Sequence, residues 1–260
     1  MRYENILIKK DDKVAAVTLD RPQVHNAMNE TLMKELTACF KDLDLDESTR
    51  VVVLTGSGES FCAGADLNWM KGMVHYTRDE NLNDSMLIFK LLNQVYNCSK
   101  PVICCVNGNA FGGGIGLIAA CDITISVKQA KFAFSEVKLG LIPAVISTFV
   151  SNRMRISDMK RLFITGERFD ADHAHKIGLI DIVVQPDEMD EKVKSITHGL
   201  LSSAPVAVRE VKNLIHNIKT MRYDDYVKYT VEKITELRMS KEGQEGINAF
   251  LEKRKPVWSE

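Results

Sequence analysis

Two loops of small residues have the composition of a site that binds a negatively charged oxygen. Residues 60–67 read Ser-Phe-Cys-Ala-Gly-Ala-Asp-Leu and residues 107–114 read Asn-Gly-Asn-Ala-Phe-Gly-Gly-Gly, and each follows an expected buried strand. Adjacent glycines at a helix start let a ligand approach the backbone closely and leave amide N–H groups free at the positive end of the helix dipole. Such amides stabilise charge that develops on a substrate oxygen. The same glycines also suit tight packing of a helix on a sheet, and spacing alone does not separate the two interpretations.

Glu136 is a candidate for proton transfer. It follows a short expected strand and lies within residues 134–143, which are otherwise mainly apolar. Because apolar surroundings disfavour the charged form of a carboxyl group, we expect the pKa of Glu136 to lie above its usual range, which favours proton transfer near neutral pH. The alternative is an exposed glutamate at a strand end.

Other residues fit weaker patterns. Residues 114–119 match the G-x-G-x-x-A form of a dinucleotide-binding loop, but the expected helix ends near Asp122 and the next strand carries no acidic residue to bind a ribose. Cys62 has no implied histidine partner, which favours a packing role over a nucleophile. His173 and His175 are two residues apart on an expected helix and face different sides, so we expect no metal site.

Strand and helix patterns alternate along the first part of the chain and position these loops. Continuous apolar runs at residues 51–54 and 101–106 are typical of strands buried on both faces. Residues 55–63 are expected to form a loop, and Asn107-Gly108 a turn. Further strands are expected at residues 5–8, 13–19, 123–126, 131–134 and 180–184, and helices at 29–43, 79–96, 112–121, 157–165, 171–177, 189–201, 206–218, 223–238 and 241–252. The order predicts an α/β fold with a parallel-type core and C-terminal helices.

Composition and charge argue against several classes of protein. The 260 residues include 34 Lys+Arg and 35 Asp+Glu, giving a net charge of −1, and no basic stripe points to nucleic acid. The longest apolar run, residues 110–121, is too short to span a bilayer, and no signal peptide is visible. Six cysteines without metal-ligand spacing indicate reduced thiols. We therefore expect a cytoplasmic protein with no membrane or nucleic-acid partner.

Four segments together resemble the crotonase superfamily, also called the enoyl-CoA hydratase/isomerase family, over nearly the whole chain. Residues 21–28 resemble its R-P-x-x-x-N-A-[LM] segment, and residues 61–67 its F-[CS]-[AS]-G-x-D-[LI] motif. Residues 107–122 resemble N-G-x-[AC]-x-G-G-G followed by [CS]-D, and residues 165–180 resemble T-G-x-x-[FIL]-x-A-x-x-A-x-x-x-G-L-[IV]. Each motif is moderately specific alone, and the four in this order are very specific.

The resemblance implies a crotonase-like spiral of β-β-α turns with a C-terminal helical region. It divides the chain into a core with the acyl-CoA site at residues 1–200 and a helical region at residues 201–260 for oligomerisation and closure over CoA. It implies a homotrimer or a dimer of trimers, and an acyl-CoA thioester substrate whose coenzyme A is part of the substrate rather than a separate cofactor. The pathways implied are fatty acid or branched-chain amino acid catabolism.

The resemblance also assigns the reacting groups. The two backbone amides that bind the thioester oxygen fall on Ala65 and Gly113. Hydratases of the family usually carry two glutamates, of which one falls on Glu136 and the other on Gly116, where this chain has no carboxylate. It therefore implies that Glu136 transfers protons alone or with a water molecule.

Three activities remain open. The chain resembles hydratases that add water to an enoyl-CoA, and residues 139–147 with Gly116 resemble a bacterial subgroup associated with methylglutaconyl-CoA and related hydratases. A lone glutamate is also the pattern of Δ3,Δ2-enoyl-CoA isomerases. A catalytically inactive acyl-CoA binder is the third possibility.

The same resemblance implies where CoA binds. The early segment and the Gly-Ala-Asp loop supply most candidates, and a C-terminal Phe and Lys of a neighbouring subunit close over the nucleotide. The candidates are Gln23, Val24, His25, Ala63, Ala65, Asp66, Leu67, Asn68, Gly112, Gly113, Phe250 and Lys253.

Overall fold

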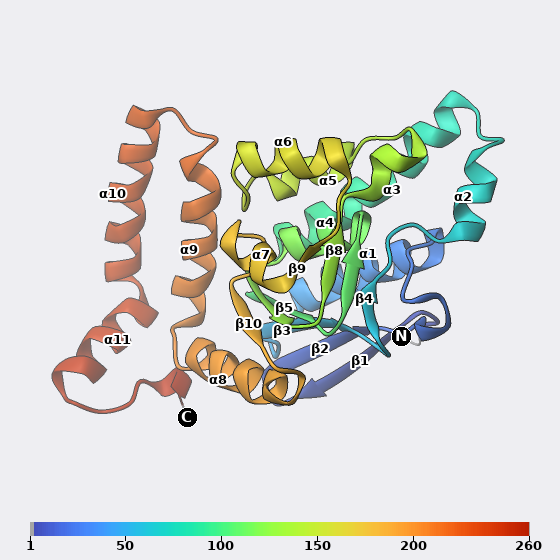
Figure 1. Cartoon of the computed structure of the whole chain (residues 1–260). Coiled ribbons are helices and arrows are strands. Elements are labelled where there is room, and N and C mark those ends of the chain that lie inside the picture. Colours follow the sequence, from blue (N-terminus) through green and yellow to red (C-terminus); the bar gives the residue numbers. More distant parts are fainter. Residues whose placement is uncertain (1–2, 260) are drawn as a thin grey trace.

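Two β-sheets form the centre of the computed structural model, which describes residues 3–259 (Figure 1). The larger sheet has the order β1-β2-β3-β5-β7-β10 and the smaller one β4-β6-β8-β9. In the larger sheet β1 is antiparallel to β2, and the other neighbours are parallel. The strands are β1 (Ile6–Asp11), β2 (Val14–Leu19), β3 (Val51–Gly56), β4 (Ser60–Cys62), β5 (Val102–Val106), β6 (Asn109–Phe111), β7 (Ile123–Val127), β8 (Lys131–Ala133), β9 (Phe169–Asp170) and β10 (Ile182–Val184).

Helices cover the sheets, and local sequence signals fix where several begin. Asn29 caps the first helix by accepting a hydrogen bond from Leu32 N at 2.9 Å, and Thr77 with Glu80 forms a capping box on the third. The α-helices are α1 (Glu30–Leu45), α2 (Leu67–Met73), α3 (Arg78–Tyr96), α4 (Gly113–Ala120), α5 (Ala144–Val150), α6 (Ile156–Thr165), α7 (Ala171–Lys176), α8 (Met189–Leu201), α9 (Pro205–Ile218), α10 (Tyr223–Met239) and α11 (Lys241–Leu251). Short 3₁₀ helices are η1 (Pro22–Val24), η2 (Ser135–Leu139), η3 (Pro186–Glu188) and η4 (Val257–Ser259).

The chain repeats one pattern three times. A strand of the larger sheet is followed by a strand of the smaller sheet and then by helix: β3 and β4 precede α2, β5 and β6 precede α4, and β7 and β8 precede η2 and α5. These successive β-β-α turns confirm the mixed α/β, crotonase-like fold expected from the sequence. The buried residues of β3 and β5 account for the continuous apolar runs, because helices and the smaller sheet leave neither face of these strands in water.

The short elements were predicted least well. Residues 55–63 were expected to form a loop, but β3 extends to Gly56 and β4 occupies Ser60–Cys62. The turn expected at Asn107-Gly108 runs directly into β6, and α2 and α5 had no counterpart. Strands of two or three residues are too short to show an alternating pattern, so only their pairing partners define them.

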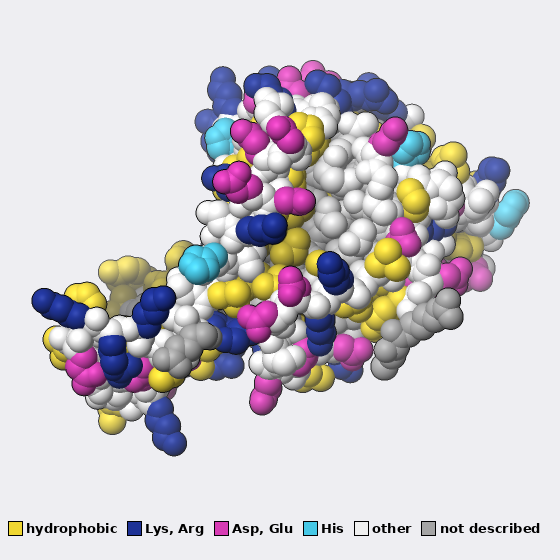
Figure 2. Space-filling view, turned by 90° about the horizontal axis from the view of Figure 1, so that it is seen from below, with side chains coloured by type: hydrophobic (Ala, Val, Ile, Leu, Met, Phe, Trp, Pro, Cys, Tyr) yellow, Lys and Arg dark blue, Asp and Glu magenta, His cyan; other side chains and the backbone are white. Residues whose placement is uncertain are grey.

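The C-terminal helices α9, α10 and α11 stand to one side of the sheets, at the opposite end of the molecule from α2 (Figure 1). The chain end then returns to the core: Arg50 Nη1 donates to the carbonyl oxygens of Leu201 and Trp258, both at 3.0 Å. Figure 2 shows Lys/Arg and Asp/Glu side chains mixed over one face of the molecule, with no single-sign stripe on it. Across residues 3–259, the structure contains no helix with the length and hydropathy needed to cross a bilayer.

Candidate active site

The three segments singled out in the sequence follow three neighbouring strands of the smaller sheet. β4 pairs in parallel with β6, and β6 with β8. The Ala63–Ala65 segment, the Gly112-Gly113 pair and Glu136 therefore all lie beyond the carboxyl ends of adjacent strands. This is the edge of an open α/β sheet at which ligands bind.

The amides of Ala65 and Gly113 have no hydrogen-bond acceptor within residues 3–259. Ala65 forms a parallel bridge with Met28, in which Met28 N donates to Gly64 O at 2.7 Å and Asp66 N donates to Met28 O at 2.9 Å. In such a bridge the central residue directs its own N–H away from the partner strand. Gly113 is the first residue of α4, so no helical carbonyl precedes it to accept its hydrogen. Both amides are thus available to a ligand oxygen.

The carboxyl group of Glu136 lies against the backbone of Gly112. A β-carbon added to Gly112 would lie 3.2 Å from Oε1 of Glu136, and Gly112 has a φ of 48°, which glycine adopts readily. Oε2 is buried and has no hydrogen-bond partner among residues 3–259. Burial raises the pKa of Glu136, as the sequence predicted, while a hydrogen bond from its own backbone opposes the shift.

Aromatic packing anchors the segment that carries Glu136. The ring of Phe134, two residues earlier, is buried and lies 4.5 Å from that of Phe163 and 6.1 Å from that of Phe169, measured between centroids. On the other side, Leu141 N donates to Glu136 O at 3.0 Å and closes the turn. The carboxyl group is therefore held on a fixed piece of backbone rather than on a free loop.

Gly116, where the usual first glutamate is absent, faces apolar side chains. A β-carbon at this position would lie 2.5 Å from Cγ2 of Ile146 and 3.1 Å from Cδ1 of Leu92. Ile146 belongs to α5 and Leu92 to α3, so Gly116 lets these helices pack closely on α4. The space beside α4 is filled by hydrocarbon, and a side chain at position 116 requires Ile146 to move.

Residues 21–28 pack against the Gly-Ala-Asp loop and stabilise it. Arg21 Nη2 donates to Asp66 Oδ2 at 2.9 Å, and both side chains are largely buried. The buried Asn26 donates from Nδ2 to the carbonyl oxygens of Ser57 and Ser60, both at 2.8 Å. Sequence reasoning had not assigned Arg21 or Asn26 any role, although both belong to the motif at residues 21–28.

The structure brings most candidate CoA residues together. Gln23 and Val24 form part of η1, and His25 accepts a hydrogen bond from Ala63 N at 2.9 Å through its carbonyl oxygen. Asp66 caps α2 by accepting a hydrogen bond from Asn68 N at 2.8 Å, so its carboxylate is bound within the protein. Leu67 and Asn68 are exposed at the start of α2.

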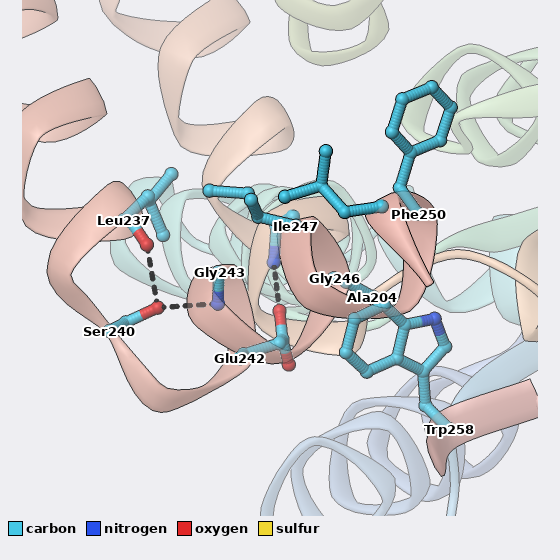
Figure 3. Close-up of a pocket in the computed structure, with 11 residues that line it drawn as sticks. Ala204, Leu237, Ser240, Glu242, Gly243, Gly246, Ile247, Phe250 and Trp258 are labelled. Carbon is cyan, nitrogen blue, oxygen red and sulfur yellow. Dashed lines mark hydrogen bonds between the residues drawn. The ribbon is translucent and has the colours of Figure 1, made fainter. Parts of the chain in front are cut away.

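Phe250 and Lys253 do not lie near the other candidates. Phe250 is in the last turn of α11 and Lys253 follows that helix, while Leu67 and Asn68 begin α2 at the opposite end of the molecule (Figure 1). Phe250 is 84% exposed and lies on the rim of a hollow of about 360 Å³ between α9, α10, α11 and Trp258 (Figure 3). This hollow is lined mainly by apolar side chains and is separate from the segments around Glu136.

The remaining chemistry-bearing residues are occupied by packing or by other partners. Cys62 is buried in β4 rather than in a loop, and burial raises the pKa of its thiol to about 12, which leaves it protonated. The Nε2 atom of His173 lies 3.1 Å from Nη2 of Arg161, and Nδ1 of His175 lies 3.0 Å from Ile180 O. The two histidines thus have separate partners.

Two free amides beside a buried carboxyl group define a site that can polarise a carbonyl oxygen and move a proton on a neighbouring carbon. A family model described as "Enoyl-CoA hydratase/isomerase" matches residues 9–260. The chain is 35% identical to a short-chain-enoyl-CoA hydratase of Clostridium acetobutylicum, over 98% of this chain and 97% of that protein. It is 34% identical to a crotonyl-CoA hydratase of Syntrophomonas wolfei, over 98% of both.

A solved structure supports the same relationship. The crystal structure of an enoyl-CoA hydratase from Shewanella pealeana superposes with a TM-score of 0.95 at 36% identity, covering 99% of this chain and 97% of that one. The chain belongs to the enoyl-CoA hydratase/isomerase family, the crotonase superfamily.

Proposed function

We propose that the protein adds water across the 2,3 double bond of an enoyl-CoA thioester. The observation that carries this proposal is the position of the Glu136 carboxyl group. Its Oε2 atom is buried and has no hydrogen-bond partner among the described residues, and its Oε1 atom lies against Gly112, the residue before the free amide of Gly113. The hydratases to which the chain is similar support the choice of reaction. The reaction needs no cofactor beyond the coenzyme A of its substrate.

In the proposed reaction the Ala65 and Gly113 amides donate hydrogen bonds to the thioester oxygen. Glu136 removes a proton from water as its oxygen attacks C3, and the electron pair of the double bond moves onto the thioester as an enolate. The protonated Glu136 then returns that proton to C2, so the elements of one water molecule are added. General acid–base catalysis of this kind contributes about 10²–10⁴ in rate.

Isomerisation of a 3-enoyl-CoA is the alternative, because the packing at Gly116 leaves no second carboxylate there. A single carboxylate is sufficient to remove a proton from C2 and deliver it to C4, with no water added. The contacts of the Gly116 position with Ile146 and Leu92 favour a one-carboxylate reaction of either kind.

We propose a branched acyl group of the 3-methylglutaconyl type, or a related one, as the substrate. Leu139, Leu141 and Ile142, which closely follow Glu136, are 59%, 55% and 72% exposed. Such exposure of large apolar side chains beside a site marks a surface that a ligand covers. It supports contact of these side chains with an acyl chain.

We propose that CoA is bound between residues 23–25 and 63–68, and that Phe250 and Lys253 of a neighbouring subunit close over it in a homotrimer or a dimer of trimers. The exposed apolar residues of α9–α11, among them Ile215, Val231 and Phe250, support association through these helices. Light scattering of the purified protein tests this, and a particle of 29.2 kDa, the mass of one chain, contradicts it. We also propose a cytoplasmic location, which the six free cysteines support.

Three substrates in H₂¹⁸O test the reaction. Incubation with crotonyl-CoA, 3-methylglutaconyl-CoA and a 3-enoyl-CoA is followed by mass spectrometry. We expect ¹⁸O in the hydroxyacyl product, with the highest kcat/KM for 3-methylglutaconyl-CoA. Conversion of the 3-enoyl-CoA alone, without ¹⁸O, shows an isomerase, and CoA binding with no turnover of any substrate shows a non-catalytic binder.

A further inference from the structure

We propose that Met28 is a positioning residue that sets the separation of the Ala65 and Gly113 amides. The inference rests on the proposed function, in which both amides bind the thioester oxygen. Met28 contacts the two segments in different ways, one through its backbone and the other through its side chain.

The backbone of Met28 fixes the Ala65 segment. Its N–H and carbonyl oxygen bond to Gly64 O and Asp66 N, at 2.7 and 2.9 Å, on either side of Ala65. Two hydrogen bonds that bracket one residue fix both of its peptide planes. The direction of the Ala65 N–H is therefore tied to the position of Met28.

The side chain of Met28 fixes the Gly113 segment. A β-carbon added to Gly113 would lie 2.2 Å from Met28 Cε and 3.9 Å from Met28 Sδ. Among the described residues outside α4 and those adjoining Gly113, only Met28 comes within 4 Å of that β-carbon. Met28 is 2% exposed, so its methyl group supports Gly113 from inside the protein. Because carbon atoms resist approach below about 3.5 Å, this methyl group limits how close Gly113 comes to the Ala65 segment.

The surroundings of Met28 make it a rigid support. Arg21 donates hydrogen bonds to Ala27 O through Nη1 and, at 2.9 Å, to Asp66 Oδ2 through Nη2. Arg21 therefore joins the residue before Met28 to the loop that carries Ala65. Asn29, the residue after Met28, caps α1. Met28 is thus held at both sides of its own backbone, and its side chain transmits that position to Gly113.

Shortening this side chain should misplace the Gly113 amide without removing it. We expect Met28→Ala to lower kcat by about 10²-fold, since a displacement of about 1 Å in a catalytic group has effects of that size. KM for CoA-containing substrates should change little, because Met28 is 2% exposed and offers a bound nucleotide almost no surface. Met28→Val should lie between alanine and the wild type, and Met28→Leu, which is allowed by the N-A-[LM] pattern, should retain most of the activity.

A chromophoric thioester, 4-dimethylaminocinnamoyl-CoA, gives a readout that loss of core packing does not mimic. Its absorption moves to longer wavelength when its carbonyl oxygen is polarised. We expect the shift to decrease in the order Met, Leu, Val, Ala at position 28. The matched control is Met33→Ala, which removes another fully buried methionine from α1, and which should keep the wild-type shift.

The outcomes separate this inference from the proposed function. A wild-type protein that binds the thioester without any shift contradicts the role of the amides themselves. A wild-type shift that Met28→Ala and Met28→Val leave unchanged, or that Met33→Ala reduces equally, overturns the role of Met28. If Met28→Ala does not fold, the comparison of valine, leucine and methionine decides in the same way.

Discussion

Replacing Glu136 with Gln is expected to lower kcat by about 10²–10⁴-fold, with a much smaller change in KM. Glutamine keeps the size and shape of the side chain but cannot accept and return a proton. The substitution breaks no hydrogen bond at the Oε2 position, because Oε2 of Glu136 has no partner among the described residues. Glu167→Gln, an exposed glutamate in the loop before β9, is the matched control and should retain wild-type turnover.

The pH dependence follows from the direction of the pKa shift. Burial raises the pKa of Glu136, and the proposed base is the ionised form, so activity should rise as the pH rises through this elevated value. The free energy of unfolding changes in the opposite direction and falls as the pH rises. A folded-state pKa above the unfolded one means that the native protein binds the proton more tightly, and this stabilisation is lost as the pH rises through the folded-state pKa.

Glu136→Gln should therefore melt at a higher temperature than the wild type at neutral pH, and the difference should shrink as the pH falls below the ordinary pKa of glutamate. Thermal denaturation at several pH values measures this. Near-normal turnover of the variant on the enoyl-CoA that the wild type hydrates best would contradict the assignment of Glu136.

The elements that sequence predicted well are those whose pattern is local. The apolar run at residues 51–54 and the helices expected at residues 29–43 and 79–96 each depend on a pattern within one element, and each formed close to the expected bounds. The strands of the smaller sheet are defined by pairing instead. β6 has three residues, and its partners β4 and β8 lie about 50 residues earlier and about 20 residues later in the chain.

The candidate site also combines features that depend on local sequence with features that depend on contacts between distant segments. The elevated pKa of Glu136 could be predicted because apolar residues surround it in the sequence itself. The contact of Met28 with Gly113 and the packing of Ile146 over Gly116 join residues far apart in the chain, and no spacing rule reveals them. The resemblance indicated that position 116 lacks a carboxylate, but only the fold shows that α5 fills the space.

Substituting proline for Gly113 tests whether the Gly113 amide donates a hydrogen bond to the thioester oxygen. Gly113→Ala is the matched control. Both variants place a β-carbon 2.2 Å from Cε of Met28, so both cause the same displacement of that methyl group. Only proline removes the N–H. Position 113 is the first residue of α4, where proline is well tolerated because its missing hydrogen has no helical acceptor.

We expect kcat of Gly113→Pro to fall about 10²–10³-fold below that of Gly113→Ala, the usual cost of one oxyanion donor. Some turnover should remain, because the Ala65 amide still donates to the thioester oxygen and Glu136 still transfers protons. Retained CoA binding shows that the variant is folded. Equal turnover of the proline and alanine variants would show that the Gly113 amide does not bind the oxyanion, and the free N–H at the start of α4 would then need another role.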